Sequence, residues 1–260
     1  MDEQDIIIKR DYLVVKSNQL VQKSRYELSV TEQRAVAYIC SLIKPLRGDE
    51  TRKNTPYKLE YEFSIKDYAQ ICGLYEKKGG KLYKEIRDTI ERLMQKILKL
   101  ELPNGDEVMI AWLVTAHFVK DSGNIKIRLN EDMIPYLFDL QEKFTAYGLL
   151  NILAMKSQYS IRVYELLKSY EYKGIAAFET EELKKILMVH GKKAYERFFN
   201  FSNRILDPAI AEINSLTDID ASYKTKTKGR KVIQVIFSIN QKTEGKRDIS
   251  HTRINYLLNT

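Results

Sequence analysis

The chain has 260 residues, 44% of them hydrophobic and 30% charged, which is typical of a globular protein able to bury one large or two small cores. Residues 1–145 hold 24 Lys and Arg against 23 Asp and Glu, a balance of +1, whereas residues 146–260 hold 19 against 12, a balance of +7. This asymmetry indicates that the C-terminal half meets a polyanion.

Other bulk features argue against a membrane or secreted protein. No apolar run is long enough to cross a bilayer, so we expect no membrane partner. The acidic start MDEQDIII does not resemble a secretory signal, and we expect a cytoplasmic protein. Cys40 and Cys72 fall in helical patterns, and we interpret them as small buried hydrophobic residues in a reducing cytosol, although a disulfide between them is compatible with the sequence.

In the N-terminal half, turn and capping signals separate short periodic segments. Ser29, with Glu32 three residues later, predicts a capping box at the start of a helix that Pro45 ends. Ser64 is predicted to cap a short helix that ends at Gly73. Further elements are expected as a strand at 57–63, a long helix from Lys81 to about Lys96, and strands at 97–102, from Val108 to about Val119, and at 125–129.

The C-terminal half repeats this order of elements. An apolar helical region at 133–153 leads to a helix at 157–170, a strand at 177–178 and a helix over 181–187 that Thr180 is expected to cap. Each half then reads helix, short strand, capped helix, long helix, β-hairpin. We therefore predict an α+β protein of two tandem winged-helix domains, residues 1–140 and 141–260, joined by a helical connection.

The stretch from Tyr195 to Ile239 carries the strongest functional signal. An apolar stripe predicts a long helix whose opposite face holds Arg197, Asn200, Asn203 and Arg204, side chains that reach base edges and phosphates. Within this helix, Asp207 and Pro208 fit either one kinked helix or two abutting helices. Alternating residues at 233–239 predict a strand, preceded by a basic loop with a glycine at its turn: Lys224, Lys226, Lys228, Arg230 and Lys231.

A helix with such a face, followed by a hairpin with a basic tip, is the plan of a winged helix that binds DNA. The helix would enter the major groove while the wing contacts phosphates. A basic loop taken alone is as often simply solvated surface. The helix face and the loop carry the same sign of charge, however, and this combination favours nucleic-acid binding.

A catalytic site needs a constellation of side chains that we do not find in this sequence. His117, His190 and His251 are widely separated and lack the paired spacing of a metal site, which argues against a nicking enzyme. There are 17 tyrosines, but no cluster of Arg or His marks one of them as a nucleophile. We therefore predict no catalytic residue, no metal and no cofactor.

Five short stretches stand in order over most of the chain: VKSNQLV at 15–21, LSVTEQR at 28–34, RVYELLK at 162–168, LDPAIAEIN at 206–214 and GRK at 229–231. Together they resemble the iteron-binding replication initiators of plasmids, which are built from two winged helices. The resemblance implies sequence-specific binding to direct repeats in double-stranded DNA at an origin. It also implies that monomers open the origin with the host replication initiator and helicase, while homodimers, formed through the N-terminal domain and in equilibrium with monomers, repress the initiator's gene.

The two halves are expected to divide this work. The near-neutral N-terminal half suits a protein contact, with a secondary DNA contact through Lys81, Lys84 and Arg87. The long helix of this half carries fewer Lys and Arg than two equivalent DNA-binding domains would need. We therefore expect the C-terminal half to be the principal reader of DNA.

Two alternative classes remain open. A winged-helix transcriptional repressor without a replication role would present the same chemistry to DNA. A winged-helix adaptor for other proteins would show no salt-dependent DNA binding, and the basic loop at 224–231 argues against it.

Overall fold

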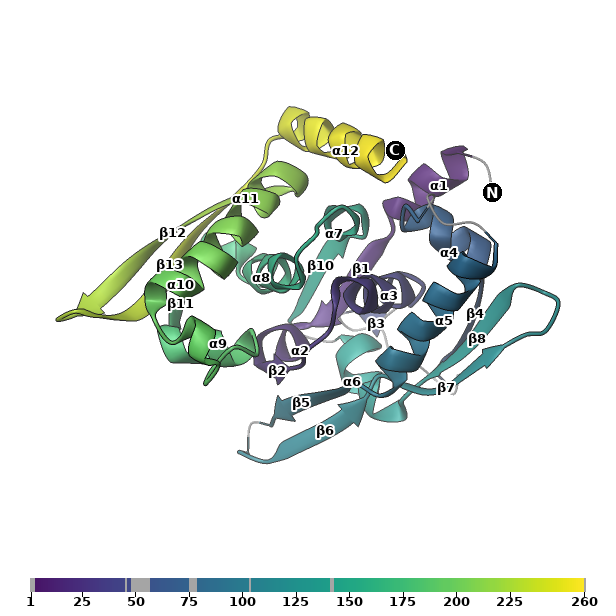
Figure 1. The fold of residues 1–260 in the computed structure, drawn as a ribbon, viewed down its shortest axis with the longest axis horizontal. Coiled ribbons are helices and arrows are strands. Elements are labelled where there is room, and N and C mark those ends of the chain that lie inside the picture. Colours follow the sequence, from purple (N-terminus) through teal and green to yellow (C-terminus); the bar gives the residue numbers. More distant parts are fainter. Residues whose placement is uncertain are drawn as a thin grey trace.

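The computed structural model describes residues 3–44, 46–47, 57–74, 79–102, 104–140 and 143–259. Two units of mixed helix and strand lie side by side along the long axis (Figure 1). Helices α3 and α8 lie near the middle, and each unit directs its hairpin toward an opposite end of the molecule.

The N-terminal unit is a winged helix. Its elements are α3 (Val30–Ser41), β4 (Glu60–Ser64), α4 (Ile65–Ile71), α5 (Gly80–Met94), β7 (Leu113–Phe118) and β8 (Asn124–Leu129). The hairpin β7–β8 takes β4 onto its inner edge, so the strand order is β4-β8-β7. The Ser29 capping box is confirmed at α3, where the hydroxyl accepts from the Glu32 N–H and the Glu32 carboxylate accepts from the Ser29 N–H.

The C-terminal unit has the same order of elements. They are α8 (Gln158–Lys168), β11 (Ile175–Glu179), α9 (Thr180–Ile186), α10 (Phe198–Phe201), a π-helical turn η4 (Ser202–Leu206), α11 (Asp207–Leu216), β12 (Ile219–Lys228) and β13 (Lys231–Gln241). Its strand order, β11-β13-β12, matches the order in the first unit. Two tandem winged helices of mixed α and β structure are therefore confirmed.

An extra hairpin interrupts the first unit between α5 and its wing. Strands β5 (Ile97–Glu101) and β6 (Glu107–Ala111) pair with each other and with β2 (Ser24–Arg25). The single strand expected from Val108 to about Val119 is thus wrong, because the chain changes sheets at Trp112. The Trp112 indole is buried and packs edge-on against Tyr26, with ring centroids 5.5 Å apart, so the backbone bends where this side chain enters the core.

The helical region expected at 133–153 is also wrong in part. The 3₁₀ turn η1 (Glu131–Met133), α6 (Ile134–Leu137) and α7 (Leu150–Leu153) are helical, but β9 (Asp139–Leu140) and β10 (Phe144–Gly148) are strands. Strand β10 pairs antiparallel with β1 (Leu13–Ser17), and β9 pairs parallel with β3 (Leu46–Arg47). Local periodicity does not reveal these strands because their partners lie in a remote part of the chain.

Two predicted helix boundaries have different outcomes. Ser64 caps α4 as expected, its hydroxyl accepting from the Asp67 N–H. Thr180 does not cap α9: Glu179 stands at the capping position, and Thr180 is already the first helical residue.

The remaining elements are α1 (Glu3–Arg10), α2 (Asn18–Lys23), η2 (Glu171–Lys173), η3 (Lys193–Tyr195) and α12 (Glu244–Asn259).

A buried ionic cluster joins the N-terminal strands to α8. The Glu165 carboxylate accepts from the Lys16 ammonium at 2.6 Å and from the hydroxyls of Tyr26 and Tyr147. The Arg162 guanidinium lies 4.6 Å from the centroid of the Tyr26 ring and 3.9 Å from a Glu165 oxygen. All five side chains are buried, so one carboxylate faces two cations and two hydroxyls inside the protein.

Helix α12 ties the two units together across one side of the molecule (Figure 1). Just before the helix, the buried Lys242 ammonium donates to the carbonyls of Asn214 and Thr217, both at 2.7 Å. Toward its end, the Arg10 guanidinium donates to the Asn255 side chain at 2.9 Å, and Leu258 packs against Gly73. The last helix is therefore fastened to α11 of one unit and to α1 and α4 of the other.

The contact at Gly73 gives a testable prediction. A Cβ at this position would lie 2.7 Å from Leu258 Cδ2 and 2.9 Å from the Leu258 carbonyl, and the backbone φ is +68°. Gly123 has the same φ but nothing within 4 Å of an added Cβ. Both Gly→Ala variants should be destabilised by about 1–3 kcal/mol of backbone strain. Only Gly73→Ala should displace α12.

Hydrogen exchange measured along α12 would separate the two effects. Its amides should exchange faster in Gly73→Ala and stay protected in Gly123→Ala. Equal protection of α12 in both variants would mean that Leu258 does not hold the helix on the first unit.

Candidate nucleic-acid interface

The long helix of the second unit is continuous from Phe198 to Leu216. Pro208 has no N–H and would clash with the carbonyl one turn earlier in a regular α-helix. The π-helical turn η4 precedes it, and the Asp207 N–H bonds to the Ser202 carbonyl five residues back. Of the two possibilities at Asp207 and Pro208, one continuous helix is therefore correct.

The helix buries the apolar face that the sequence predicts. Phe201, Ile205, Ala209 and Ile213 are almost fully buried. On the other side, Arg197, Asn203 and Arg204 are exposed and Asn200 is half-buried. Among the residues that the structure describes, no carboxylate lies within ion-pair distance of either arginine.

The start of this helix is held by α9. The buried Lys184 ammonium donates to the Glu196 carbonyl at 3.2 Å and to the Glu181 carboxylate at 3.0 Å. The Arg197 carbonyl accepts from the N–H groups of Asn200 and Phe201. These contacts fix the first turn relative to the core. The helix at 198–216, which we call the reading helix because it is the one predicted to contact bases, needs such support to present its side chains in one arrangement.

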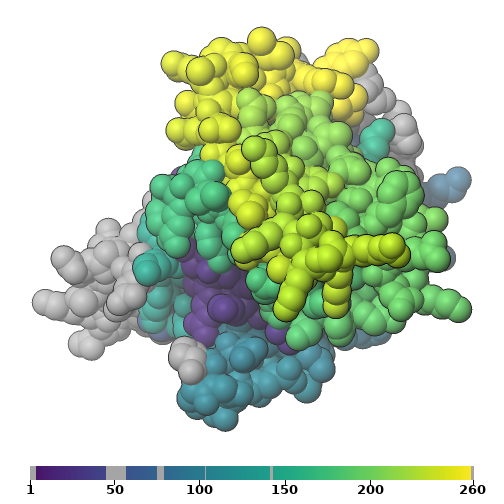
Figure 2. Space-filling view, turned by 90° about the vertical axis from the view of Figure 1, so that its left-hand side faces the viewer, coloured from purple at the N-terminus to yellow at the C-terminus, as the bar shows by residue number. Residues whose placement is uncertain are grey.

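The wing is the hairpin β12–β13. Gly229, with φ +61°, and Arg230 form the turn between Lys228 and Lys231, which face each other at the end of the ladder. The predicted phosphate-binding side chains are all exposed, and within the described part of the chain none has a carboxylate partner: Lys224, Lys226, Lys228, Arg230 and Lys231. Figure 2 views this end of the molecule, where the yellow-green side chains of the wing project from the surface.

Helix and wing tip meet along an open groove. Arg197, Phe199 and Ser202 line it from the helix, and Arg230 and Lys231 line it from the wing. The structure thus brings together predicted residues that are separated by more than thirty positions in the sequence. Asn203 and Arg204 are not among the residues that line this groove.

Carboxylates near this interface are mostly engaged with partners. Glu181 lines the groove, and its carboxylate contacts the Lys184 ammonium at 3.0 Å and His190 Nδ1 at 3.1 Å. Burial raises the pKa of Glu181, but the hydrogen bonds and charges of Lys184 and His190 together outweigh burial and hold the pKa below its ordinary value. On the helix, exposed Asp207 accepts a hydrogen bond of 2.5 Å from the Tyr223 hydroxyl.

The first unit presents a weaker version of this arrangement. Lys81 and Lys84 are exposed on α5, with no carboxylate partner among the described residues. Arg87 is engaged differently: its guanidinium contacts Glu91 at 3.0 Å and lies 4.7 Å from the centroid of the Phe118 ring. The three predicted residues therefore share one helix, but only the two lysines carry unpaired charge.

Two residues at the interface are absent from the sequence-based set. The Phe199 ring is 71% exposed on the first turn of the reading helix. The predicted apolar stripe runs through Phe198 and Phe201 and leaves Phe199 off it, which was the available signal. Lys193 is exposed and shares a second groove with Lys231. The two consecutive lysines at 192–193, a few residues before the helix, were the available signal for Lys193.

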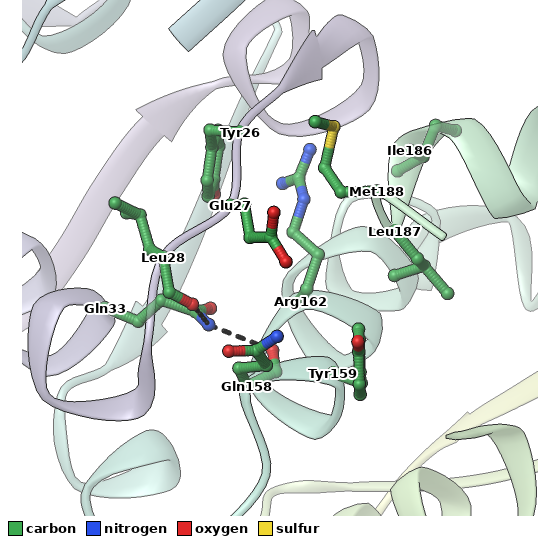
Figure 3. A pocket seen from close by; sticks show the side chains of 10 residues that line it. All are labelled: Tyr26, Glu27, Leu28, Gln33, Gln158, Tyr159, Arg162, Ile186, Leu187 and Met188. Atoms are coloured by element: carbon green, nitrogen blue, oxygen red, sulfur yellow. Dashed lines mark hydrogen bonds between the residues drawn. The ribbon is translucent and has the colours of Figure 1, made fainter. Parts of the chain in front are cut away.

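A cavity between the two units has no room for a substrate. Its volume is about 20 Å³, enough for a water molecule. Figure 3 shows side chains from both units directed toward it, with Gln33 Nε2 donating to the carbonyls of Leu28 and Gln158, both at 3.0 Å. The surrounding groups serve to join the units.

Metal-binding groups, membrane-spanning helices and reactive thiols are the other features that bear on function. No group of three or more His, Cys, Asp or Glu in the described residues is placed to hold a metal ion. Within the same ranges, no helix has the length and apolar character to span a membrane. Cys40 and Cys72 are buried free thiols, and burial raises their pKa values to about 11 and about 12, so both stay protonated at neutral pH.

Comparisons with known proteins agree with the geometry. The family models described as "Initiator Replication protein, WH1" and "Initiator Rep protein, WH2" match residues 13–168 and 179–239. A "Replication initiation protein" from Escherichia coli is 26% identical over 235 residues, covering 88% of this chain and 70% of that protein. The "PI protein" from Escherichia coli is 26% identical over 187 residues, covering 62% of this chain and 60% of that protein.

A solved structure shares the fold. The crystal structure of the Pi initiator protein in complex with iteron DNA superposes with a TM-score of 0.68 at 20% identity, covering 90% of this chain and 99% of that one. The matched WH1 and WH2 models together span most of the chain, including both winged helices described above. The chain therefore belongs to the family of initiator replication proteins that carry a WH1 and a WH2 domain.

Proposed function

We propose that this protein initiates replication of a plasmid by binding direct repeats, or iterons, in double-stranded DNA at the origin. The observation that supports this most directly is the groove where Arg197 of the reading helix meets Arg230 and Lys231 of the wing. Arg197, Asn200, Asn203 and Arg204 read bases in the major groove, and the wing cations contact phosphates.

The N-terminal winged helix, within residues 1–140, adds a weaker DNA contact and the homodimer interface. Lys81 and Lys84 supply that contact, and Arg87 joins it only if its guanidinium leaves Glu91. The C-terminal unit, within residues 141–260, is the principal reader. In the bacterial cytosol, the DNA-bound monomer opens the origin with the host replication initiator and helicase, and the dimer represses the initiator's own gene.

Binding to duplexes tests the reader. The purified protein should bind the direct repeats near its own gene more tightly than a scrambled duplex of equal length. Removing one bidentate contact to guanine, in Arg204→Ala, should cost about 1–3 kcal/mol of that discrimination. Arg253→Ala removes an exposed arginine from α12 and serves as the matched control, with selectivity unchanged. Equal affinity of the wild type for both duplexes would contradict the assignment of the reading helix.

Two further outcomes separate the alternatives. A transcriptional repressor would bind the repeats with the same selectivity, but a plasmid carrying only the gene and its repeats would not replicate. An adaptor for other proteins would bind neither duplex at any salt concentration.

A further inference from the structure

We propose that Phe199 is a specificity-determining residue that reads the C5 methyl group of a thymine within the repeat. This inference deepens the proposed function and rests on it. In the major groove the thymine methyl is the apolar feature that distinguishes a T·A pair, and phenylalanine is among the side chains that contact it.

The exposure of this ring requires an explanation. Phe199 is 71% exposed, although it lies beside Phe198 and close to Phe201, which is fully buried. The rings of Phe198 and Phe201 pack edge-to-face, with centroids 6.0 Å apart, and this pair anchors the first helical turn to the core. Phe199 contributes little to that anchor. Its ring lies on the surface that the proposed function places against DNA.

The surroundings of the ring match the edge of a DNA groove. Phe198 and Val232 give the groove half-buried apolar surface, while Arg197, Arg230 and Lys231 give it cations. Cations are suited to phosphates, and an apolar ring among them is suited to a methyl group on a base. Residues at the N-terminal end of a recognition helix are those that contact base edges, and Phe199 lies in the first turn.

The helical turn that carries the ring is held in place by hydrogen bonds of its backbone. The Ser202 hydroxyl donates to the Phe199 carbonyl at 3.1 Å, and the next N–H groups bond to the Arg197 carbonyl. A side chain with two rotatable bonds on a held helical turn loses little conformational freedom on binding. The ring can therefore discriminate between bases that differ by a single methyl group.

Deoxyuridine provides the probe, because it pairs like thymidine but lacks the methyl group. Each thymidine of the repeat is replaced in turn, and the affinity of the full-length protein is measured. At one position, or at two adjacent ones, the wild type should lose about three- to fivefold in affinity, the effect of one buried methyl group. Phe199→Ala should bind the unmodified repeat more weakly and should lose no more at that position, since the two changes remove the same contact.

Tyr172→Ala is the matched control, because Tyr172 is also 71% exposed but is not among the residues lining the groove. It should keep the wild-type sensitivity to deoxyuridine. The inference fails if no position is sensitive in the wild type, or if Phe199→Ala keeps the wild-type sensitivity. It also fails if Phe199→Ala changes only the oligomeric state, since the ring would then face a second copy of the chain.

A different result would contradict the proposed function itself: the wild type would not distinguish the repeats from the scrambled duplex at all. Selective binding without sensitivity to deoxyuridine would leave the proposed function intact and remove only the role of Phe199.

Discussion

Glu165→Ala is expected to lower the free energy of unfolding by about 3–5 kcal/mol, because it leaves a buried ammonium without its counter-charge. The Lys16 ammonium lies 2.6 Å from the Glu165 carboxylate, with the two side chains only 4% and 2% exposed. The hydroxyls of Tyr26 and Tyr147 would lose their acceptor at the same time. Chemical denaturation, followed by circular dichroism, measures the effect.

The chain offers a control of the same geometry in a different environment. Arg128 and Glu131 also stand 2.6 Å apart, but their side chains are 41% and 65% exposed. Glu131→Ala should therefore change stability by about 0–1 kcal/mol, because water screens an exposed pair. Similar losses in both variants would show that burial does not set the strength of the Lys16–Glu165 pair.

The pH dependence of stability has a definite sign. Burial raises the pKa of Glu165, but the charges of Lys16 and Arg162 outweigh it and hold the pKa below the ordinary value of 4.5. A lowered carboxyl pKa contributes stability above the unfolded value and loses it as the pH falls through the folded value. The pKa of Lys16 is raised, so its contribution persists throughout the neutral range. The wild type should thus lose more stability than Glu165→Gln on acidification below the ordinary Glu pKa.

The cluster also gives a physical meaning to two of the stretches that resemble plasmid initiators. VKSNQLV contains Lys16, and RVYELLK contains Arg162 and Glu165. In the structure these stretches meet in the buried cluster, away from the groove between reading helix and wing. These motif residues therefore hold the fold together and bear on DNA only through the arrangement of the domains.

How much of the fold could be predicted depended on whether its cause was local. The Ser29 capping box and the apolar face of the reading helix involve neighbours within one or two helical turns, so the sequence displays them directly. The pairing of β1 with β10 joins Val15 to Ala146, and nothing near either residue marks it. The change of sheet at Trp112 depends on its packing against Tyr26, which is equally remote.

The candidate site follows the same rule. Periodicity placed Arg197 and Arg204 on the outer face of a helix, and the structure has both exposed. Their roles on DNA stay a prediction. The i,i+4 spacing of Arg87 and Glu91 was a local signal for their pairing. The packing of Arg87 on Phe118 was not visible in the sequence, because it depends on how the wing is set against the helix. The exposed fraction of the Phe199 ring likewise depends on the surroundings of the helix.

Replacing all five wing cations with alanine, at positions 224, 226, 228, 230 and 231, should reduce the slope of log K against log salt by about 4–5. Each exposed cation that neutralises a phosphate releases a counterion and contributes about 0.9 to the slope. The five side chains have no carboxylate partners in the described residues, so their charge is available to DNA. Raising the salt from about 50 to about 200 mM should therefore cost the wild type about 10²–10³-fold more affinity than it costs the variant.

The size of the change in slope shows which cations contact phosphates. Replacing Lys226 and Lys228 alone should remove about 2 from the slope, whereas replacing Lys99 and Arg253, exposed cations on other elements, should leave it unchanged. Arg204→Ala should reduce selectivity and shift the slope by no more than about 1, because base contacts depend on hydrogen-bond geometry and phosphate contacts depend on charge. If the wing variants lost selectivity without a change of slope, the hairpin would be reading bases, and the division of work between helix and wing would be reversed.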